Sequence, residues 1–359
     1  MSLKDLVVEN IRSIGRAELS LHARRNLIWG PNGSGKTSLL EAMFLLGRGR
    51  SFRTRNSERL IQHGQPQLIA FGRLDSVPER AIGVQVSRAD GTIAKVDGQF
   101  VRSLTELSQA FAVQIIDPGI HRLVEEGGNR RRKWIDWLVF HVEPSFMDNW
   151  SAYTRALKQR NAALKHQPEQ VSFWDTELLR FGLLLDSARR SAVARLAPYW
   201  VELSSRLAGL DLELSYAQGW PQDLTFSDAL SQSADRDRLK GVTHAGPHRA
   251  DIRLRQSGRL ARDTLSRGQQ KLAAIAMTLA PLRLIQDATG IAPTLLLDDP
   301  EAELDSSRLA GFIEEVEQLN CQLVFTALHQ TTLFGTPESV FHVEQGRVRS
   351  GIMSHLKAE

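Results

Sequence analysis

Eight consecutive residues near the start of the chain, 30–37, have the types and spacing of a phosphate-binding loop. They read Gly-Pro-Asn-Gly-Ser-Gly-Lys-Thr and match G-x-x-x-x-G-K-[ST] at every position. Glycines let the backbone curl around a phosphate, and N–H groups at a helix N-terminus attract its negative charge. Lys36 would face the β- and γ-phosphates of a nucleotide, and the Thr37 hydroxyl would hold Mg²⁺. The alternative is a glycine-rich turn that matches by chance.

The segments on either side favour the phosphate loop over that alternative. Residues 25–29 (RNLIW) predict a short buried strand, and residues 38–46 (SLLEAMFLL) have helical composition. A strand that leads through the motif into a helix is the context in which it binds phosphate. We therefore expect ATP to be contacted by Gly30, Pro31, Asn32, Gly33, Ser34, Gly35, Lys36, Thr37 and Ser38.

A pair of carboxylates far downstream could complete this chemistry. Residues 294–297 (TLLL) predict a buried strand that ends in Asp298 and Asp299. Asp298 would anchor Mg²⁺, and Asp299 would act as the general base that orients the attacking water. The alternative is an ordinary polar strand end, which the presence of the phosphate loop disfavours. Asp299, Asp298 and Lys36 are the expected catalytic residues.

Residues 265–271 (LSRGQQK) precede an apolar helical run, 272–279. They resemble the signature motif of the ATP-binding-cassette (ABC) ATPases, in which such a segment caps the γ-phosphate of ATP held by a partner subunit. That resemblance assigns nucleotide contacts to Ser266, Gly268 and Gln269, whereas the alternative is a plain helix N-cap at Ser266. Two half-sites on one chain imply an ATP-dependent homodimer.

The distance between the motifs separates two classes of cassette ATPase. Ser266 lies 230 residues after Lys36, whereas the gap is commonly much shorter in the transporter ATPases. The long insertion resembles the SMC-like branch, whose heads act on DNA. A transport-coupled ATPase subunit, which would also need a surface for a membrane partner, is therefore the less favoured function.

Several strings along residues 3–350 together resemble the RecF family. They are residues 6–13 (LVVENIRS), 46–53 (LGRGRSFR), 128–136 (GNRRRKWID), 158–164 (KQRNAAL) and 246–251 (GPHRAD), with Glu303 and Asp305 at the family's D-loop. The chain departs from the family after the acidic pair, where Pro300 and Glu301 replace an apolar and a small residue. His329 stands three positions beyond Thr326, too late for the switch histidine of a cassette ATPase, and we assign it no catalytic role.

The resemblance implies an α/β fold, an ABC/SMC-type P-loop ATPase head with an inserted α-helical lobe. It implies a weak ATPase of recombinational repair, DNA replication restart and the SOS response, with ATP and Mg²⁺ as cofactors. The ATP-bound dimer would grip single- and double-stranded DNA at gap junctions, slow hydrolysis would release it, and RecO- and RecR-type proteins would be its partners. By resemblance, Gln114 would be the Q-loop residue that contacts both nucleotide and Mg²⁺. A pure scaffold that uses ATP only to hold its shape is the remaining alternative.

The two halves of the nucleotide site must meet although they are far apart in sequence. We therefore predict a discontinuous ATPase core, 1–125 with 240–359, and a helical lobe over 126–239, where leucines and arginines recur at helical spacing. The Asp90-Gly91 pair between the alternating runs 81–86 and 92–96 predicts a hairpin.

Two arginine-rich segments are candidates for DNA phosphates. One holds Arg48, Arg50, Arg53, Arg55 and Arg59, and the other is the run 130–133. The alternatives are a solvated helix face or arginines paired with acids in the core. His244 and His248 have an H-x₃-H spacing, but without cysteines nearby a zinc site is disfavoured.

The composition of the 359 residues agrees with a cytoplasmic protein. Apolar residues make up 42% and charged residues 24%, and the formal net charge is +4. The one cysteine, Cys321, permits no internal disulfide. No apolar run approaches the roughly 18 residues of a membrane span, and Lys4 and Asp5 interrupt the place of a signal peptide.

Overall fold

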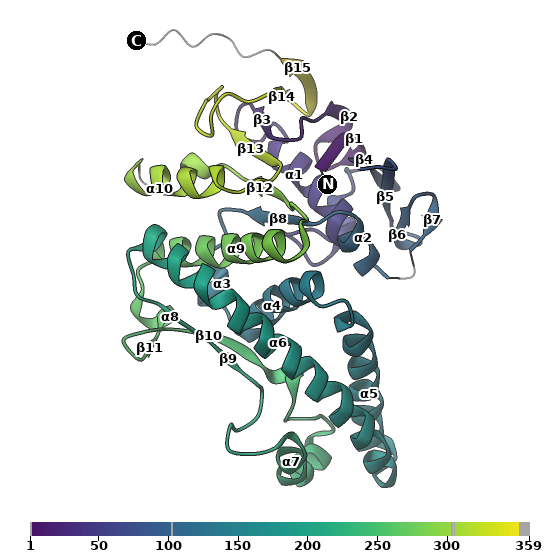
Figure 1. The fold of residues 1–359 in the computed structure, drawn as a ribbon. Coiled ribbons are helices and arrows are strands. Elements are labelled where there is room, and N and C mark those ends of the chain that lie inside the picture. The colour runs from purple at the N-terminus through teal and green to yellow at the C-terminus, as the bar shows by residue number, and fades with distance from the viewer. Residues whose placement is uncertain (1, 102, 303, 305, 352–359) are drawn as a thin grey trace. The chain divides into compact units, whose positions relative to one another are not determined.

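The computed structural model describes residues 2–101, 103–302, 304 and 306–351 (Figure 1). The chain forms two compact units: unit 1 is Met1–Ile120 with Gly290–Glu359, and unit 2 is His121–Thr289. These boundaries differ from the sequence-based division at residues 125 and 240. The difference arises because residues 240–289 include helix α9 (Arg267–Thr289), which packs against α4 (Gly128–Val142) and α6 (Val171–Ala208) of unit 2.

Unit 1 contains an antiparallel sheet with the strand order β2-β1-β4-β5-β6-β7. Its strands alternate buried and exposed residues, as a sheet with one covered face requires. The predicted hairpin at Asp90-Gly91 is confirmed, since it joins β5 to β6. The strands are β1 (Ser2–Ile11), β2 (Ile14–Ser20), β4 (Gln67–Asp75), β5 (Arg80–Ser87), β6 (Gly91–Val96) and β7 (Gln99–Phe100).

The second sheet of unit 1 has the order β15-β14-β3-β13-β12-β8. All neighbours are parallel except β14 and β15, so five strands end at one edge. The predicted strands 25–29 and 294–297 are confirmed as β3 and β12. The strands are β3 (Arg25–Trp29), β8 (Val113–Ile116), β12 (Thr294–Leu297), β13 (Leu323–Ala327), β14 (Ser339–Glu344) and β15 (Arg347–Gly351).

Helix α1 (Lys36–Arg48) packs against strands of both sheets and brings most of its apolar residues into the main core of unit 1. Phe312 of α10 (Ser306–Glu317) contacts Phe334, which in turn contacts Phe325 of β13. Burial of the parallel strands explains their continuous apolar sequences. Unit 1 also contains α2 (Thr105–Ala110) and the 3₁₀ turns η1 (Ser57–Leu60) and η4 (Pro300–Ala302).

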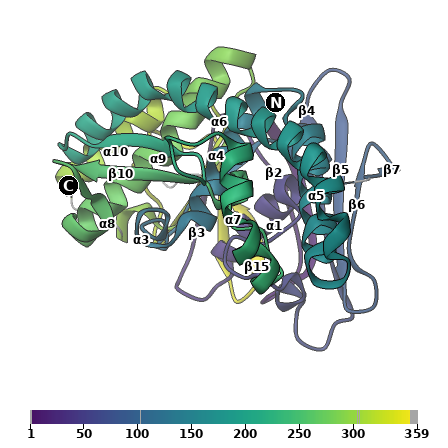
Figure 2. The same ribbon diagram turned by 90° about the horizontal axis from the view of Figure 1, so that it is seen from below.

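Unit 2 is mostly helical, and its long helices α5 and α6 run side by side (Figure 2). Its small antiparallel sheet has the order β11-β10-β9. No helix within the described residues is both long and apolar enough to span a membrane. The elements are α3 (Arg122–Glu125), α4 (Gly128–Val142), α5 (Phe146–His166), η2 (Pro168–Gln170), α6 (Val171–Ala208), β9 (Glu213–Ala217), α7 (Phe226–Lys240), η3 (Pro247–Arg249), β10 (Asp251–Gln256), β11 (Arg259–Leu260), α8 (Ala261–Thr264) and α9.

Candidate nucleotide site

The phosphate loop, residues 30–37, leaves β3 through a position that only glycine can occupy. Gly30 has φ 150°, and a Cβ there would collide with the carbonyl oxygen of Val343. Gly35, at the start of α1, has φ 117°, in the left-handed region that favours glycine. The glycine spacing therefore follows from the close approach of neighbouring strands and turns as well as from phosphate binding.

A second contact fixes the shape of the loop. The N–H of Gly346, in the turn between β14 and β15, donates to the carbonyl oxygen of Ser34 at 2.9 Å. The Ser34 hydroxyl itself is buried and has no hydrogen-bond partner within the described residues. A buried hydroxyl without a partner costs free energy unless something supplies one. A phosphate oxygen in the loop would do so.

Lys36 lies across the loop that precedes it. Its ammonium group donates to the carbonyl oxygens of Gly30 at 2.7 Å and Pro31 at 3.1 Å, and the residue is only 7% exposed. Burial lowers the pKa of Lys36, while the charges of Asp299 and Asp298 oppose that shift. The ammonium is thus held where phosphate charge would stabilise it.

Asp298 meets Thr37 at the carboxyl edge of the parallel sheet. The Thr37 hydroxyl donates to the two Asp298 carboxylate oxygens at 3.0 and 3.1 Å. Burial raises the pKa of Asp298, and hydrogen bonds from Thr37 and Thr326 oppose the rise. A buried carboxylate beside a hydroxyl offers the oxygen ligands that Mg²⁺ prefers, with phosphates and water completing its shell. These residues therefore fit Mg²⁺.

Asp299 adopts a left-handed backbone, with φ 53°, directly after β12. Its N–H donates to the Thr326 hydroxyl at 2.8 Å, and the same hydroxyl donates to Asp298 at 3.1 Å. Pro300 then begins the η4 turn, a first position that its fixed φ suits. The departure from the family sequence is thus accommodated locally. Glu303 and Asp305, expected in the D-loop, lie outside the described residues.

Thr326 and Asp117 were not predicted to belong to the site. Thr326 is in β13, whose parallel pairing with β12 puts it beside Asp298. Asp117 follows β8, and its charge adds to the rise in the pKa of Asp298. The signal that could have found both was a polar side chain at the end of an apolar strand run, once the strands are taken as parallel neighbours.

Gln114 is not brought to this edge. It lies within β8 in register with Leu295, three residues before Asp298 along the neighbouring strand. At about 3.3 Å per residue, that is about 10 Å from the edge. His329 is exposed beyond the end of β13.

The signature segment lies in unit 2, at the N-terminus of α9. Gln269 Oε1 accepts from the Ser266 N–H at 3.0 Å, and Ser266 Oγ accepts from the Gln269 N–H at 3.3 Å. This reciprocal pair is a capping box, so the N-cap interpretation holds for Ser266. Ser266 and Gly268 are also exposed. The helix N-terminus can therefore meet an anion from outside the chain.

The two arginine-rich segments differ in their surroundings. In the run 130–133, Arg131 is buried and forms a bidentate pair with Asp251, at 2.8 and 2.9 Å, while Arg130 pairs with Glu126. For Arg131 the structure therefore matches the alternative of an arginine paired with an acid, since its guanidinium pairs inside unit 2. In the first segment, Arg50, Arg53, Arg55 and Arg59 are exposed, and burial lowers the pKa of Arg48 to about 9.

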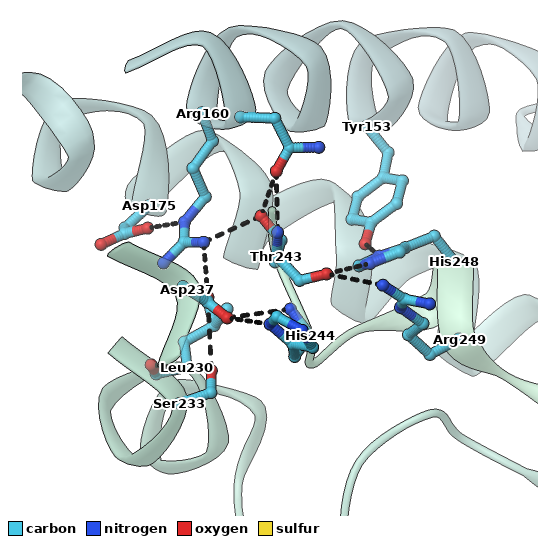
Figure 3. Close-up of polar contacts among 11 residues, drawn as sticks. Tyr153, Arg160, Asp175, Leu230, Ser233, Asp237, Thr243, His244, His248 and Arg249 are labelled. Atoms are coloured by element: carbon cyan, nitrogen blue, oxygen red, sulfur yellow. Dashed lines mark hydrogen bonds and ion pairs between the residues drawn. The ribbon is translucent and has the colours of Figure 1, made fainter. Parts of the chain in front are cut away.

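A buried polar network in unit 2 contains both histidines of the H-x₃-H pair (Figure 3). Arg160 donates to Asp175 at 2.6 Å and to Asp237 and Thr243 at 2.8 Å each. His244 contacts Asp237 at 2.8 Å, and His248 lies between the Tyr153 hydroxyl and the Thr243 carbonyl. Within the described part of the chain, no three His, Cys, Asp or Glu side chains group as metal ligands.

Comparisons with known proteins identify the family of this chain. The family described as "RecF/RecN/SMC N terminal domain" matches residues 2–349. "DNA replication and repair protein RecF" of Stutzerimonas stutzeri (strain A1501) is 40% identical over 97% of each chain. That of Pseudomonas putida (strain W619) is 39% identical, over 97% of this chain and 98% of the relative.

Solved structures show the same fold. "Structure of the recombination mediator protein RecF-ATP in RecFOR pathway" superposes with a TM-score of 0.87 at 26% identity, covering 98% of this chain and 97% of that one. An SMC head domain from Pyrococcus furiosus, 14% identical with a TM-score of 0.59, shares the fold alone. The phosphate loop, the acidic strand end and the helical insertion thus occur together in a chain that belongs to the RecF family and has the α/β fold of RecF and SMC heads.

Proposed function

We propose that the protein is an ATP-dependent DNA-binding protein of recombinational repair and replication restart, in which weak ATP hydrolysis works as a conformational switch. The observation that carries this proposal is the meeting of Lys36, Thr37 and Asp298 at one sheet edge. The relative solved as RecF–ATP, which this chain matches over 98% of its length, supports ATP as the nucleotide.

The residues of the site divide the chemistry among them. Loop N–H groups and Lys36 bind the phosphates, and Thr37 with Asp298 would hold Mg²⁺. Bound Mg²⁺ would neutralise charge on the β- and γ-phosphates. Asp299, fixed through its N–H by Thr326, orients the attacking water and accepts its proton.

Dimerisation follows from the exposed signature segment. Ser266 and Gly268 at the N-terminus of α9 would cap the γ-phosphate bound by a second copy, so that ATP joins two chains. The dimer grips DNA near gaps, with the exposed arginines 50, 53, 55 and 59 as candidate phosphate contacts. RecO- and RecR-type proteins in the cytoplasm are the proposed partners, in line with the RecFOR pathway of the solved relative.

The dimer is tested by molar mass in solution with ATP–Mg²⁺, with ADP–Mg²⁺ and without nucleotide. Wild type should dimerise only with ATP, and Ser266→Arg should stay monomeric although it binds ATP normally. Ser172→Arg, at another exposed helix position of unit 2, is the matched control and should dimerise. A wild-type protein that binds ATP and stays monomeric would refute this mechanism.

A further inference from the structure

Glu41 is a fully buried carboxylate in α1, five residues after Lys36, and the chemistry described above does not use it. Its side chain is 0% exposed, and its helix neighbours Leu40 and Ala42 are core residues. An ionised group in such surroundings is costly unless it is paired and hydrogen-bonded. The partners of Glu41 therefore indicate why a charge is kept there.

The first partner comes from the turn between β1 and β2. Arg12 donates to both carboxylate oxygens of Glu41, through Nε at 3.1 Å and Nη2 at 3.2 Å. Its backbone N–H donates to Leu60 O at 2.7 Å, and it has a left-handed φ of 54°. The turn is thus fixed from two sides, and Glu41 holds its side chain.

This turn lies directly on the phosphate loop. A Cβ on Gly35 would come within 3.1 Å of Ile14 and 3.2 Å of the Ser13 hydroxyl. A Cβ on Gly346, whose N–H holds Ser34, would collide with the carbonyl oxygen of Ser13. Backbones packed this closely cannot move independently, so a displaced Arg12 turn would change the shape of the loop.

The second partner lies in the segment after α1. Ser51 Oγ donates to Glu41 at 2.6 Å and accepts from the N–H groups of Arg53 and Thr54 at 3.0 and 3.2 Å. The Arg53 guanidinium is 3.9 Å from Glu41. Glu41 thus also fixes the start of the segment that follows α1.

We propose that Glu41 is a positioning residue of the nucleotide site. Its carboxylate holds the Arg12 turn against the phosphate loop and also holds Ser51 at the start of the segment after α1. One buried charge thereby sets the shape of the phosphate loop without touching the nucleotide. The inference rests on the proposed ATP site and adds a residue that determines the shape of that site.

The test compares Glu41→Gln with Asp237→Asn. Both replace a carboxylate that is 0% exposed and pairs with an arginine, but Asp237 belongs to the network of unit 2. Affinity for ATP–Mg²⁺, single-turnover hydrolysis and Tm are measured for each. Both variants should have a lower Tm than wild type. Only Glu41→Gln should also weaken ATP binding and slow hydrolysis, by about 10- to 100-fold, which is typical of residues that orient the groups in contact with a ligand.

Arg12→Gln breaks the same pair from the side of the turn and keeps the inference testable if Glu41→Gln misfolds; it should also lower ATP affinity. Ser51→Ala leaves the Arg12 pair intact and should keep ATP affinity near that of wild type. The inference is overturned if Glu41→Gln and Arg12→Gln change ATP affinity and hydrolysis no more than Asp237→Asn does, or if Ser51→Ala lowers ATP affinity as much as they do. Failure of wild type to bind ATP would instead refute the proposed function.

Discussion

Buried charges occur in both units, but the protein balances them to different degrees. In unit 2, Arg160 is 2% exposed and bonds two carboxylates and a hydroxyl, so its charge is matched by protein groups. In unit 1, burial lowers the pKa of Lys36 and raises that of Asp298, so each charged form is disfavoured. The Arg160 network therefore stabilises the fold of unit 2, whereas the poorly balanced charges of Lys36 and Asp298 mark a candidate ligand site.

The largest effect expected from this comparison is on the stability of unit 2. Arg160→Leu leaves Asp237 buried without its arginine, which should cost about 3–5 kcal/mol of unfolding free energy. Urea denaturation measures the loss, and ATP affinity should be unchanged. The exposed Arg155→Leu on the same helix is the control and should cost little. A stable Arg160→Leu protein would show that the network is not what balances this charge.

Asp299→Asn should give the next largest effect, confined to turnover. The amide keeps the size of the side chain but cannot accept a proton, so hydrolysis should slow by about 10²- to 10⁴-fold. ATP-dependent dimers should form and persist, as single-turnover kinetics and molar mass would show. Asp263→Asn, at an exposed position, is the control and should hydrolyse ATP at the wild-type rate. If Asp299→Asn also hydrolyses ATP at that rate, another residue orients the water.

Lys36→Ala separates affinity from stability. Loss of a charge-assisted bond of about 1.5–3 kcal/mol should weaken ATP binding roughly 10- to 100-fold and remove ATP-dependent DNA retention. Tm without nucleotide should not fall as it does for Arg160→Leu, because a poorly balanced buried charge is removed. ATP affinity is measured by calorimetric titration of each variant with ATP. Lys165→Ala, which removes an exposed lysine, is the control and should bind ATP as wild type does. Unchanged ATP affinity would place nucleotide binding elsewhere.

The smallest effect expected is on the pH dependence of stability. Burial lowers the pKa of His248 to about 4 from its ordinary 6.5, so the folded state holds the neutral ring. Stability from this residue is therefore full above pH about 6.5 and is lost as the pH falls toward about 4. Urea titrations across that window should show a shallower loss for His248→Gln. Asp298 in unit 1 should have the opposite effect on stability. Because its pKa is raised, protonation at low pH removes the cost of burying its charge and so stabilises the folded state. Equal slopes for wild type and His248→Gln would contradict the assignment.

The loop, its flanking elements and the acidic strand end could be predicted because each is local in sequence. Strand β3, the glycine pattern and Lys36 lie within a dozen residues, and β12 carries its carboxylates at its own end. Contacts that depend on tertiary pairing could not be predicted. Thr326 reaches Asp298 through a parallel register, and Arg12 reaches Glu41 through a hairpin folded over a helix.

The arginines show the same limit. Arg131 and Arg53 both lie in basic runs, yet one pairs inside unit 2 with Asp251, 120 residues away, and the other is exposed. Composition cannot distinguish them, because the deciding partner is distant in sequence. The boundary between the units was missed for a related reason, since α9 belongs by packing to the helices of unit 2 and by motif to the nucleotide chemistry.

The hydrogen bond from Gly346 to Ser34 has a consequence for how the protein matures on the ribosome. The phosphate loop is synthesised about 300 residues before its partners, since the strands beside β3 and the turn that fixes Ser34 come from residues 323–351. Since chains emerge from the N-terminus at about 5–20 residues per second, the loop waits tens of seconds for these partners. Nascent chains therefore acquire a shaped nucleotide site only after residues 323–351 have been synthesised, and protein truncated before them should lack it.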